Sequence, residues 1–272
     1  MLGTLASCYS PRVLPGAPCD PVAANCPEHQ SCALVGADHI CVEGLPADAG
    51  ADGPPSDAPM PVDAQLDAAV TSPWTLIQTS GDSAPMTTIA PTGAGHLIVV
   101  AVETSRTSSV VSVMDNVGNT YVAIPGSRAT EAVDNLGVEL WYAQDSLPGA
   151  TTITASGSTI FSTVSWEVAG IRTANALDTA SAFDDRPAST TPRGAPITTS
   201  VDGEFVVSVA IVASSITGIR AGNEFTNDRL TFGNGWAHLT DAAALAGSHR
   251  AQWNQSSLGG YCVSSAAFFV GP

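Results

Sequence analysis

The sequence predicts an all-β protein: an antiparallel β-sandwich preceded by a small disulfide-stapled segment and a disordered linker. Five of the six cysteines fall within residues 1–42, and residues 43–72 consist mainly of Pro, Ala, Asp and Gly. Residues 73–272 contain all five Trp and all seven Phe. In that last region short runs rich in Val, Ile, Thr and aromatics alternate with Gly, Asn, Asp and Ser. Such evenly spaced strands and turns are typical of sandwiches and barrels.

The charge of the chain argues against nucleic-acid binding, and its hydropathy argues against a transmembrane helix. The chain has 272 residues and a formal net charge of −16, and its nine basic residues are all Arg. Because nucleic-acid binding depends on clustered basic side chains that displace counterions from phosphate, this balance argues against a nucleic-acid partner. No apolar run reaches the ~18–20 residues of a transmembrane helix. We therefore expect an acidic, extracytoplasmic protein.

The first eight residues end in a short pattern around a cysteine. Leu5, Ala6 and Ser7 precede Cys8, and small residues behind an apolar segment are features of a signal-peptide cleavage site. We predict that residues 1–8 are a signal remnant and that Cys8 is lipidated. The apolar part is shorter than the usual ~7–15 residues and lacks a basic flank. Pairing of Cys8 with another cysteine therefore stays open as the alternative.

Residues 9–42 form the predicted cysteine-rich knot. Cys19, Cys26, Cys32 and Cys41 are separated by six, five and eight residues. A stretch this short cannot build a stabilising core, so we expect two disulfides that contribute roughly 2–4 kcal/mol each. Four cysteines allow three pairings, and the sequence does not choose between them. Zinc binding, with His29 and His39 nearby, is the weaker alternative because a tight C-x₂₋₄-C spacing is missing.

Residues 43–72 are predicted to be a semi-stiff disordered linker. Prolines bias this stretch to extended polyproline II, and regularly spaced aspartates make it self-repelling. It has too few apolar side chains to offset the entropy of ordering. Residues 1–72 carry nine acidic residues and one Arg, whereas residues 73–272 carry sixteen acidic residues and eight Arg. The charge density is therefore higher in the shorter, N-terminal part.

The N-terminal arrangement resembles that of uncharacterised bacterial envelope lipoproteins. In those proteins a lipidated cysteine, a stapled knot and a Pro/Asp stalk follow one another. The matching residues are Cys8-Tyr9-Ser10-Pro11, Cys19, Cys26-Pro27, Gln30-Ser31-Cys32 and Cys41. The resemblance covers residues 5–70 and implies attachment to the cell envelope through a lipid anchor, at the bacterial surface or outer membrane, or secretion. It implies no activity.

Residues 73–272 are predicted to form one β-sandwich domain. We expect strands at 74–79, 86–90, 96–104, 110–114, 120–124, 137–143, 151–155, 160–168, 197–199, 205–213, 237–240, 248–253 and 261–270. A short helix is predicted only at 241–246. The runs 96–102 and 205–212 have few polar positions, which favours central strands. Alternation places Val138, Leu140 and Tyr142 on one face and Glu139 and Trp141 on the other. Cys262 is expected to be a small buried hydrophobic side chain.

This domain also resembles β-sandwich modules of the jelly-roll or immunoglobulin-like kind that recur in secreted bacterial proteins. The matching segments are 95–100, 113–121, 140–143, 166–170, 251–253 and 266–270. The likeness implies the fold and an extracellular setting. It carries over no catalytic residue.

The segment from Asp115 to Tyr121 is the clearest local signal in this domain. Asn and Gly tolerate positive φ, so the first interpretation is a hairpin turn capped by asparagines. The alternative is a calcium loop with Asp115, Asn116 and Asn119 as oxygen ligands, helped by Asp184 or Asp185. Calcium prefers six to eight oxygens, and this segment alone offers too few. We therefore expect no cofactor, with calcium as the alternative.

No nucleophile elbow, nucleotide-binding glycine loop or His-Glu-x-x-His motif occurs in the sequence. The expected function is therefore a non-enzymatic cell-surface or secreted module for adhesion to a glycan or protein, with Trp141, Trp236 and Tyr121 as the candidate binding residues. A structural or assembly subunit that pairs through sheet edges is the second hypothesis. A glycoside hydrolase using Glu139 and Glu167 is the third, since that reaction needs two facing carboxylates.

Overall fold

The computed structural model of the protein describes residues 30–35, 38–43, 73–229, 232–242 and 244–271. The chain forms two compact units, Met1–Ala64 and Gln65–Pro272. The described residues form strands and turns without any helix, which confirms the all-β prediction. That part of the chain accordingly contains no helix that could span a membrane.

The first unit contains a β-hairpin that the cysteine spacing did not predict. Strand β1 (Gln30–Val35) pairs antiparallel with β2 (Asp38–Glu43). The register places Cys32 directly opposite Cys41. Cys8, Cys19, Cys26, His29 and residues 44–72 of the predicted linker lie outside the described residues.

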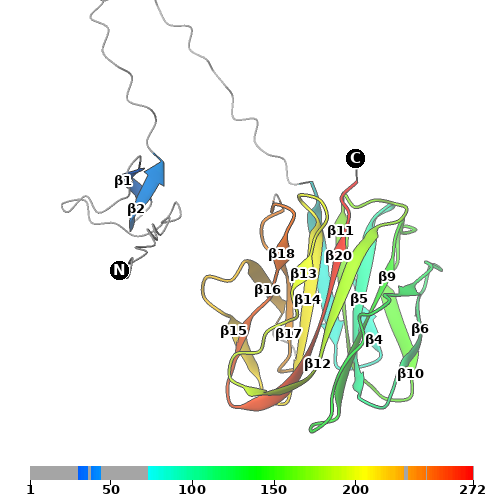
Figure 1. Ribbon diagram of the computed structural model, residues 1–272. Coiled ribbons are helices and arrows are strands. Elements are labelled where there is room, and N and C mark those ends of the chain that lie inside the picture. Colours follow the sequence, from blue (N-terminus) through cyan, green and yellow to red (C-terminus); the bar gives the residue numbers. More distant parts are fainter. Residues whose placement is uncertain (1–29, 36–37, 44–72, 230–231, 243, 272) are drawn as a thin grey trace, which may run out of the picture. The chain divides into compact units, whose positions relative to one another are not determined.

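The second unit is built on two large antiparallel sheets (Figure 1). The first sheet has the order β3 (Thr75–Asp82), β11 (Ile160–Ala169), β5 (Leu97–Ser105), β9 (Leu136–Ala143), β7 (Val122–Ala123), with β8 (Ala129–Glu131) also paired to β9. The second sheet has the order β12 (Leu177–Ser189), β20 (Gly259–Phe268), β14 (Phe205–Val212), β17 (Gly235–Leu239), β16 (Phe225–Arg229).

The inner faces of these two sheets enclose the main core. Trp166 from the first sheet and Phe205 and Trp236 from the second are fully buried there. Val138 and Leu140 also lie in this core, with Tyr142 packed at its margin, as the predicted alternation along β9 requires. The second unit is therefore a sandwich whose two large sheets pack together through large apolar side chains.

Smaller sheets cover the outer face of each large sheet. A sheet in the order β4 (Met86–Thr88), β10 (Thr152–Gly157), β6 (Val110–Asp115) packs on the first sheet around a second core. The pairs β13 (Ile197–Thr198) with β18 (Ser248–His249), and β15 (Ile216–Ile219) with β19 (Trp253–Gln255), pack on the second sheet. Strands β5 and β14 are thus buried on both faces along their whole length. This confirms the central strands predicted from their apolar runs.

The two halves of the second unit repeat one topology, which the sequence reading as a single sandwich had missed. In the first half, β3 pairs with β11, and β11 pairs with the central strand β5. In the second half, β12 pairs with β20, and β20 pairs with the central strand β14. The loops before β7 and β16 carry the matching pairs Gly118-Asn119 and Gly222-Asn223, and both glycines have positive φ. Tyr121 and Phe225 follow two residues after these asparagines, and both are buried.

The sequence analysis missed several strands whose side chains are mostly small or polar. Strand β12, the longest of the described strands, was missed because Thr, Ser, Ala and Asp dominate it. Strands β8, β15 and β16 were missed for the same lack of apolar alternation. The predicted strand at 248–253 is two short strands, β18 and β19. No helix occurs in the described part of 241–246, where the Ala244 N–H donates to the Asp241 carbonyl at 3.1 Å and closes a turn.

Replacing Phe205 tests the packing between the two large sheets. Phe205 is fully buried, with its ring centroid 4.9 Å from that of Trp74. We expect Phe205→Ala to lower the free energy of unfolding by about 3–5 kcal/mol, because it removes apolar contacts and leaves a cavity. The matched variant Phe161→Ala, at a side chain that is 45% exposed, should change it by roughly 0.5 kcal/mol or less. Equal losses in urea denaturation of the two variants would contradict this assignment of the core.

Candidate functional site

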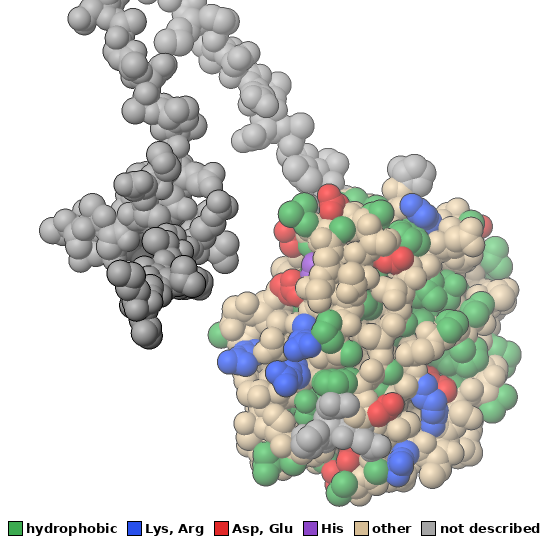
Figure 2. Space-filling model, viewed as in Figure 1, with side chains coloured by type: hydrophobic (Ala, Val, Ile, Leu, Met, Phe, Trp, Pro, Cys, Tyr) green, Lys and Arg blue, Asp and Glu red, His purple; other side chains and the backbone are tan. Residues whose placement is uncertain are grey.

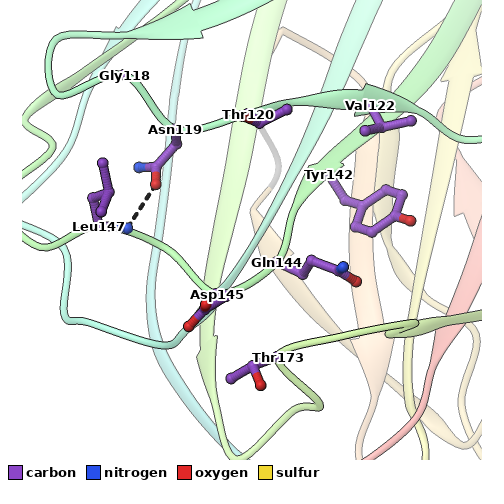
Figure 3. A pocket seen from close by; sticks show the side chains of 9 residues that line it. All are labelled: Gly118, Asn119, Thr120, Val122, Tyr142, Gln144, Asp145, Leu147 and Thr173. Carbon is purple, nitrogen blue, oxygen red and sulfur yellow. Dashed lines mark hydrogen bonds between the residues drawn. The ribbon is translucent and has the colours of Figure 1, made fainter.

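A pocket of about 450 Å³ opens where β7, the edge strand of the first sheet, meets the end of β9 (Figure 3). Three segments of the first half surround it: the loop between β6 and β7, the end of β9, and the turn before β10. The link between the two halves closes the remaining side. The lining residues are Gly118, Asn119, Thr120, Val122, Tyr142, Gln144, Asp145, Leu147 and Thr173.

Asp115 shapes the loop that forms one wall of this pocket. Its Oδ1 accepts hydrogen bonds from the backbone N–H groups of Val117, Gly118 and Asn119 at 2.8–3.1 Å. Its Oδ2 accepts from the Asn119 amide at 2.6 Å and from the Tyr121 hydroxyl at 3.1 Å. Burial raises the pKa of the Asp115 carboxyl, but these hydrogen bonds outweigh it and lower the pKa below its ordinary value. Burial, together with the Asp115 charge, raises the pKa of Tyr121.

The oxygens predicted as calcium ligands are acceptors for the chain itself. Asn119 Oδ1 accepts from the Leu147 N–H at 2.6 Å (Figure 3), and Asn116 Oδ1 accepts from the Thr151 and Thr152 N–H groups. Asp184 accepts from the N–H of Thr130, and the side chain of Asp185 lies outside the described residues. Among the side chains that the structure describes, no group of three or more His, Cys, Asp or Glu could hold a metal. This geometry favours the capped turn over the calcium loop.

The other walls of the pocket present varied polar groups beside one aromatic ring (Figure 3). Tyr142 is half-buried, and its ring centroid lies 5.7 Å from that of Phe268, which holds the ring in place. Gln144 accepts the Ala176 N–H through Oε1 at 2.9 Å, so its Nε2 remains to donate. Asp145 and Thr173 are exposed at the rim. A carboxylate, an amide, a hydroxyl and an aromatic ring thus line one hollow.

Trp141, Trp236 and Tyr121, the predicted binding residues, do not form a common surface. Trp236 is fully buried in the main core, where its ring centroid lies 6.4 Å from that of Trp166, and its ring is not exposed at the surface. Strand β17 turns this side chain toward the first sheet. Tyr121 is buried, and its hydroxyl donates a hydrogen bond to Asp115. Trp141 lies on the opposite face of β9 from Tyr142 and packs half-buried against the core under β4, β10 and β6.

Glu139 and Glu167, named for the hydrolase hypothesis, serve separate structural networks. Glu167 accepts from the N–H of Gly93 and lies 2.6 Å from His96 Nδ1, whereas Glu139 accepts from Val110 N–H and pairs with Arg128. Across the central strand, Glu167 is opposite Ile98 and Glu139 opposite Val102. Four residues of strand separate these positions by about 13 Å, beyond the ~9.5 Å upper limit for paired glycosidase carboxylates.

Sequence reasoning missed Gln144, Asp145 and Thr173, and it assigned Tyr142 only to the strand face that it shares with Val138 and Leu140. The predicted alternation along β9 is correct. Tyr142, however, is the last residue but one of the strand, and there its side chain lines the pocket. Two polar residues directly after a strand end were the signal that could have located the site, since binding residues concentrate on loops. No protein-family model, curated protein or solved structure matches this chain.

The Asp115 carboxylate gives a testable pH dependence. We expect Asp115→Ala to lower the free energy of unfolding at pH 7 by about 1–3 kcal/mol, because it leaves the loop donors without their acceptor. The folded-state pKa lies below the ordinary 3.8, so the contribution is fully present above that value and is lost as pH falls through the folded pKa.

Urea denaturation at pH 7, 5, 4 and 3 measures this dependence, with Asp115→Asn as the comparison. The asparagine keeps Oδ1 for the backbone N–H groups, so its loss should be smaller. A deficit in Asp115→Ala that does not shrink toward pH 3, or one no larger than that of Asp115→Asn, would contradict the network.

Proposed function

We propose that this chain is a non-enzymatic extracellular or cell-surface module that binds a glycan in the pocket beside Tyr142. The observation that carries the proposal is that Tyr142, Gln144, Asp145 and Thr173 line one pocket, with Gln144 next to the Tyr142 ring (Figure 3). A pocket of about 450 Å³ falls in the range of small-ligand sites, about 300–1,000 Å³.

The chemistry of a sugar ring fits this lining. A pyranose has an apolar face of C–H groups that packs on an aromatic ring, and its hydroxyls both donate and accept hydrogen bonds. Asp145 accepts from hydroxyls, Gln144 donates through Nε2, and Thr173 does either. The scaffold favours binding because Asp115 and Asn119 fix the loop before any ligand arrives, which reduces the entropy lost on association.

We propose that the residues before the sandwich attach it to the cell envelope. The sequence features that support this are Cys8 as the lipidated residue, the cysteine-rich segment as a stapled knot and residues 43–72 as the spacer. The hairpin register supports one disulfide, between Cys32 and Cys41. Residues directly opposite in antiparallel strands have Cα atoms about 4.5–5.5 Å apart, within the range that a disulfide bridges.

Assembly through sheet edges is the second candidate function, and one observation favours it. Strand β6 is an edge of its three-stranded sheet, and Val111 and Met114 on it are 75% and 55% exposed. Exposed apolar edges promote pairing with another chain. Concentration-dependent oligomers in sedimentation that Val111→Lys abolishes would support assembly, and a strict monomer would contradict it.

A glycan array tests the binding proposal. We expect the wild-type protein to bind at least one oligosaccharide, and Tyr142→Ala and the double variant Asp145→Asn/Thr173→Ala each to weaken that binding by about tenfold or more, the equivalent of one lost charged hydrogen bond. Asparagine tolerates the positive φ of 53° at Asp145, so the double variant keeps the backbone.

The matched control for this array is Phe161→Ala, which removes an exposed aromatic ring outside the pocket. It should bind like the wild type. Absence of glycan binding by the wild-type protein, or equal binding by the Tyr142 variant with its fold intact by circular dichroism, would overturn the proposal.

Non-reducing peptide mapping of the protein isolated from its native host tests the N-terminal proposals. We expect one peptide that joins Cys32 to Cys41, and a lipid-modified peptide that begins at Cys8. A bond from Cys32 to Cys19 or Cys26 would contradict the register argument, and an unmodified Cys8 would contradict the anchor.

A further inference from the structure

A second polar hollow lies in the other half of the sandwich, away from the Tyr142 pocket. It has a volume of about 460 Å³ and adjoins a smaller hollow of about 290 Å³ through the shared residues Arg220 and Gln252. The lining of the larger hollow combines two arginines, Arg193 and Arg220, with the hydroxyl residues Ser189 and Thr191. Figure 2 shows arginine side chains gathered on the side of the molecule where β15 lies.

Backbone pairing places Arg193 and Arg220 on the two segments that flank Gln252, each opposite that residue. Arg193 forms an antiparallel bridge with Gln252. The Arg220 N–H donates to the Gln252 carbonyl at 2.9 Å, and Arg220 Nη1 donates to Gln252 Oε1 at 3.2 Å. Because adjacent strands lie about 4.8 Å apart, the two arginine Cα atoms are separated by about 10 Å. Two guanidinium groups therefore face one hollow from its two sides.

Arg193 and Arg220 differ from Arg128 in having no acidic partner among the described residues. Arg128 pairs with Glu139 at 3.0 Å, whereas no described carboxylate forms an ion pair with Arg193 or Arg220. Both side chains are exposed. Residues 73–272 carry sixteen acidic residues against eight Arg, so a hollow lined by two arginines is a local positive site on an acidic domain.

The smaller hollow uses the same loop as the Tyr142 pocket, in the other half of the repeat. Gly222 and Asn223 line it, as Gly118 and Asn119 line the first pocket. The repeated topology thus places a hollow at the corresponding loop in each half. Their charges differ: Asp145 lines the first pocket and Arg220 lines the second.

We propose that the hollow between Arg193 and Arg220 binds the oxyanion groups, carboxylate or sulfate, of an acidic polysaccharide. This rests on the proposed function and names its ligand class. A guanidinium donates two parallel hydrogen bonds to a carboxylate or sulfate, which gives both strength and orientation. The Ser189 and Thr191 hydroxyls and the Gln252 amide suit the sugar hydroxyls around the anion. The overall negative charge of the domain repels the same polymer elsewhere, so binding concentrates at this hollow.

Titration of the full chain with three polymers tests the proposal: polygalacturonate, dextran sulfate and neutral dextran, each at two salt concentrations. We expect polygalacturonate or dextran sulfate to bind at least tenfold more tightly than dextran, and binding to weaken as salt rises. Whichever acidic polymer binds identifies the anion. Arg193→Gln/Arg220→Gln should reduce that affinity at least tenfold.

The control variant Arg106→Gln/Arg172→Gln removes two exposed arginines elsewhere and so matches the change in net charge. It should change the affinity less than twofold. Equal losses in the two double variants would show general charge attraction and overturn the proposal. If polyglutamate bound as tightly through the same arginines, the ligand would not be specifically a polysaccharide. If inorganic sulfate saturated the site at micromolar concentration, the site would not require a polymer.

Failure of this inference is distinguishable from failure of the proposed function. Acidic-polymer binding that is lost in Arg193→Gln/Arg220→Gln but kept in Tyr142→Ala supports the arginine hollow as a separate subsite. Glycan binding that needs Tyr142 but is unaffected by the arginine variant overturns the arginine hollow alone. A wild-type protein that binds no glycan on the array and none of the three polymers overturns both.

Discussion

The packing of the two large sheets against each other is the interaction on which the rest of the structure depends. Trp166, Phe205, Trp236 and Phe268 are fully buried between them, and burial of large apolar side chains is the dominant favourable term in folding. Neither half could bury its inner face alone. Because the halves are joined in this way, the loops that line both hollows are held on a rigid framework rather than on an isolated hairpin.

Polar groups inside this interface add specificity to the packing. Glu103 accepts hydrogen bonds from Ser162 in its own half and from Asn234 in the other, and burial raises the pKa of its carboxyl. Trp166 Nε1 donates to Asp228 across the same interface at 2.7 Å. A buried polar group without its partner costs more than the hydrogen bond itself contributes. These contacts therefore fix the alignment of the two halves, and with it the positions of β7 and β16 at the edges of the large sheets.

The repeated topology explains how one fold presents two chemically different hollows. Each half needs a turn with positive φ before its short edge strand, and Gly118 and Gly222 supply it. The residues around these turns are not constrained by the core, so they can differ in charge. In the first half Asp145 and Tyr142 line the hollow, whereas in the second Arg220 and Gln252 line it. The scaffold is shared, and the surface residues decide what each hollow can bind.

The sequence by itself determined the strand-rich class, the central strands β5 and β14 and the alternation along β9, because these follow from local apolar periodicity. It also located the turn at Asp115. The tertiary structure alone decided that polar β12 is a strand, since its pairing with β20 replaces the apolar pattern that it lacks. It alone showed that Trp236 faces the core while Tyr142, Gln144 and Arg193 reach a hollow. The physical reason is that such a site joins residues distant in sequence, and only the packing of the sheets brings them together.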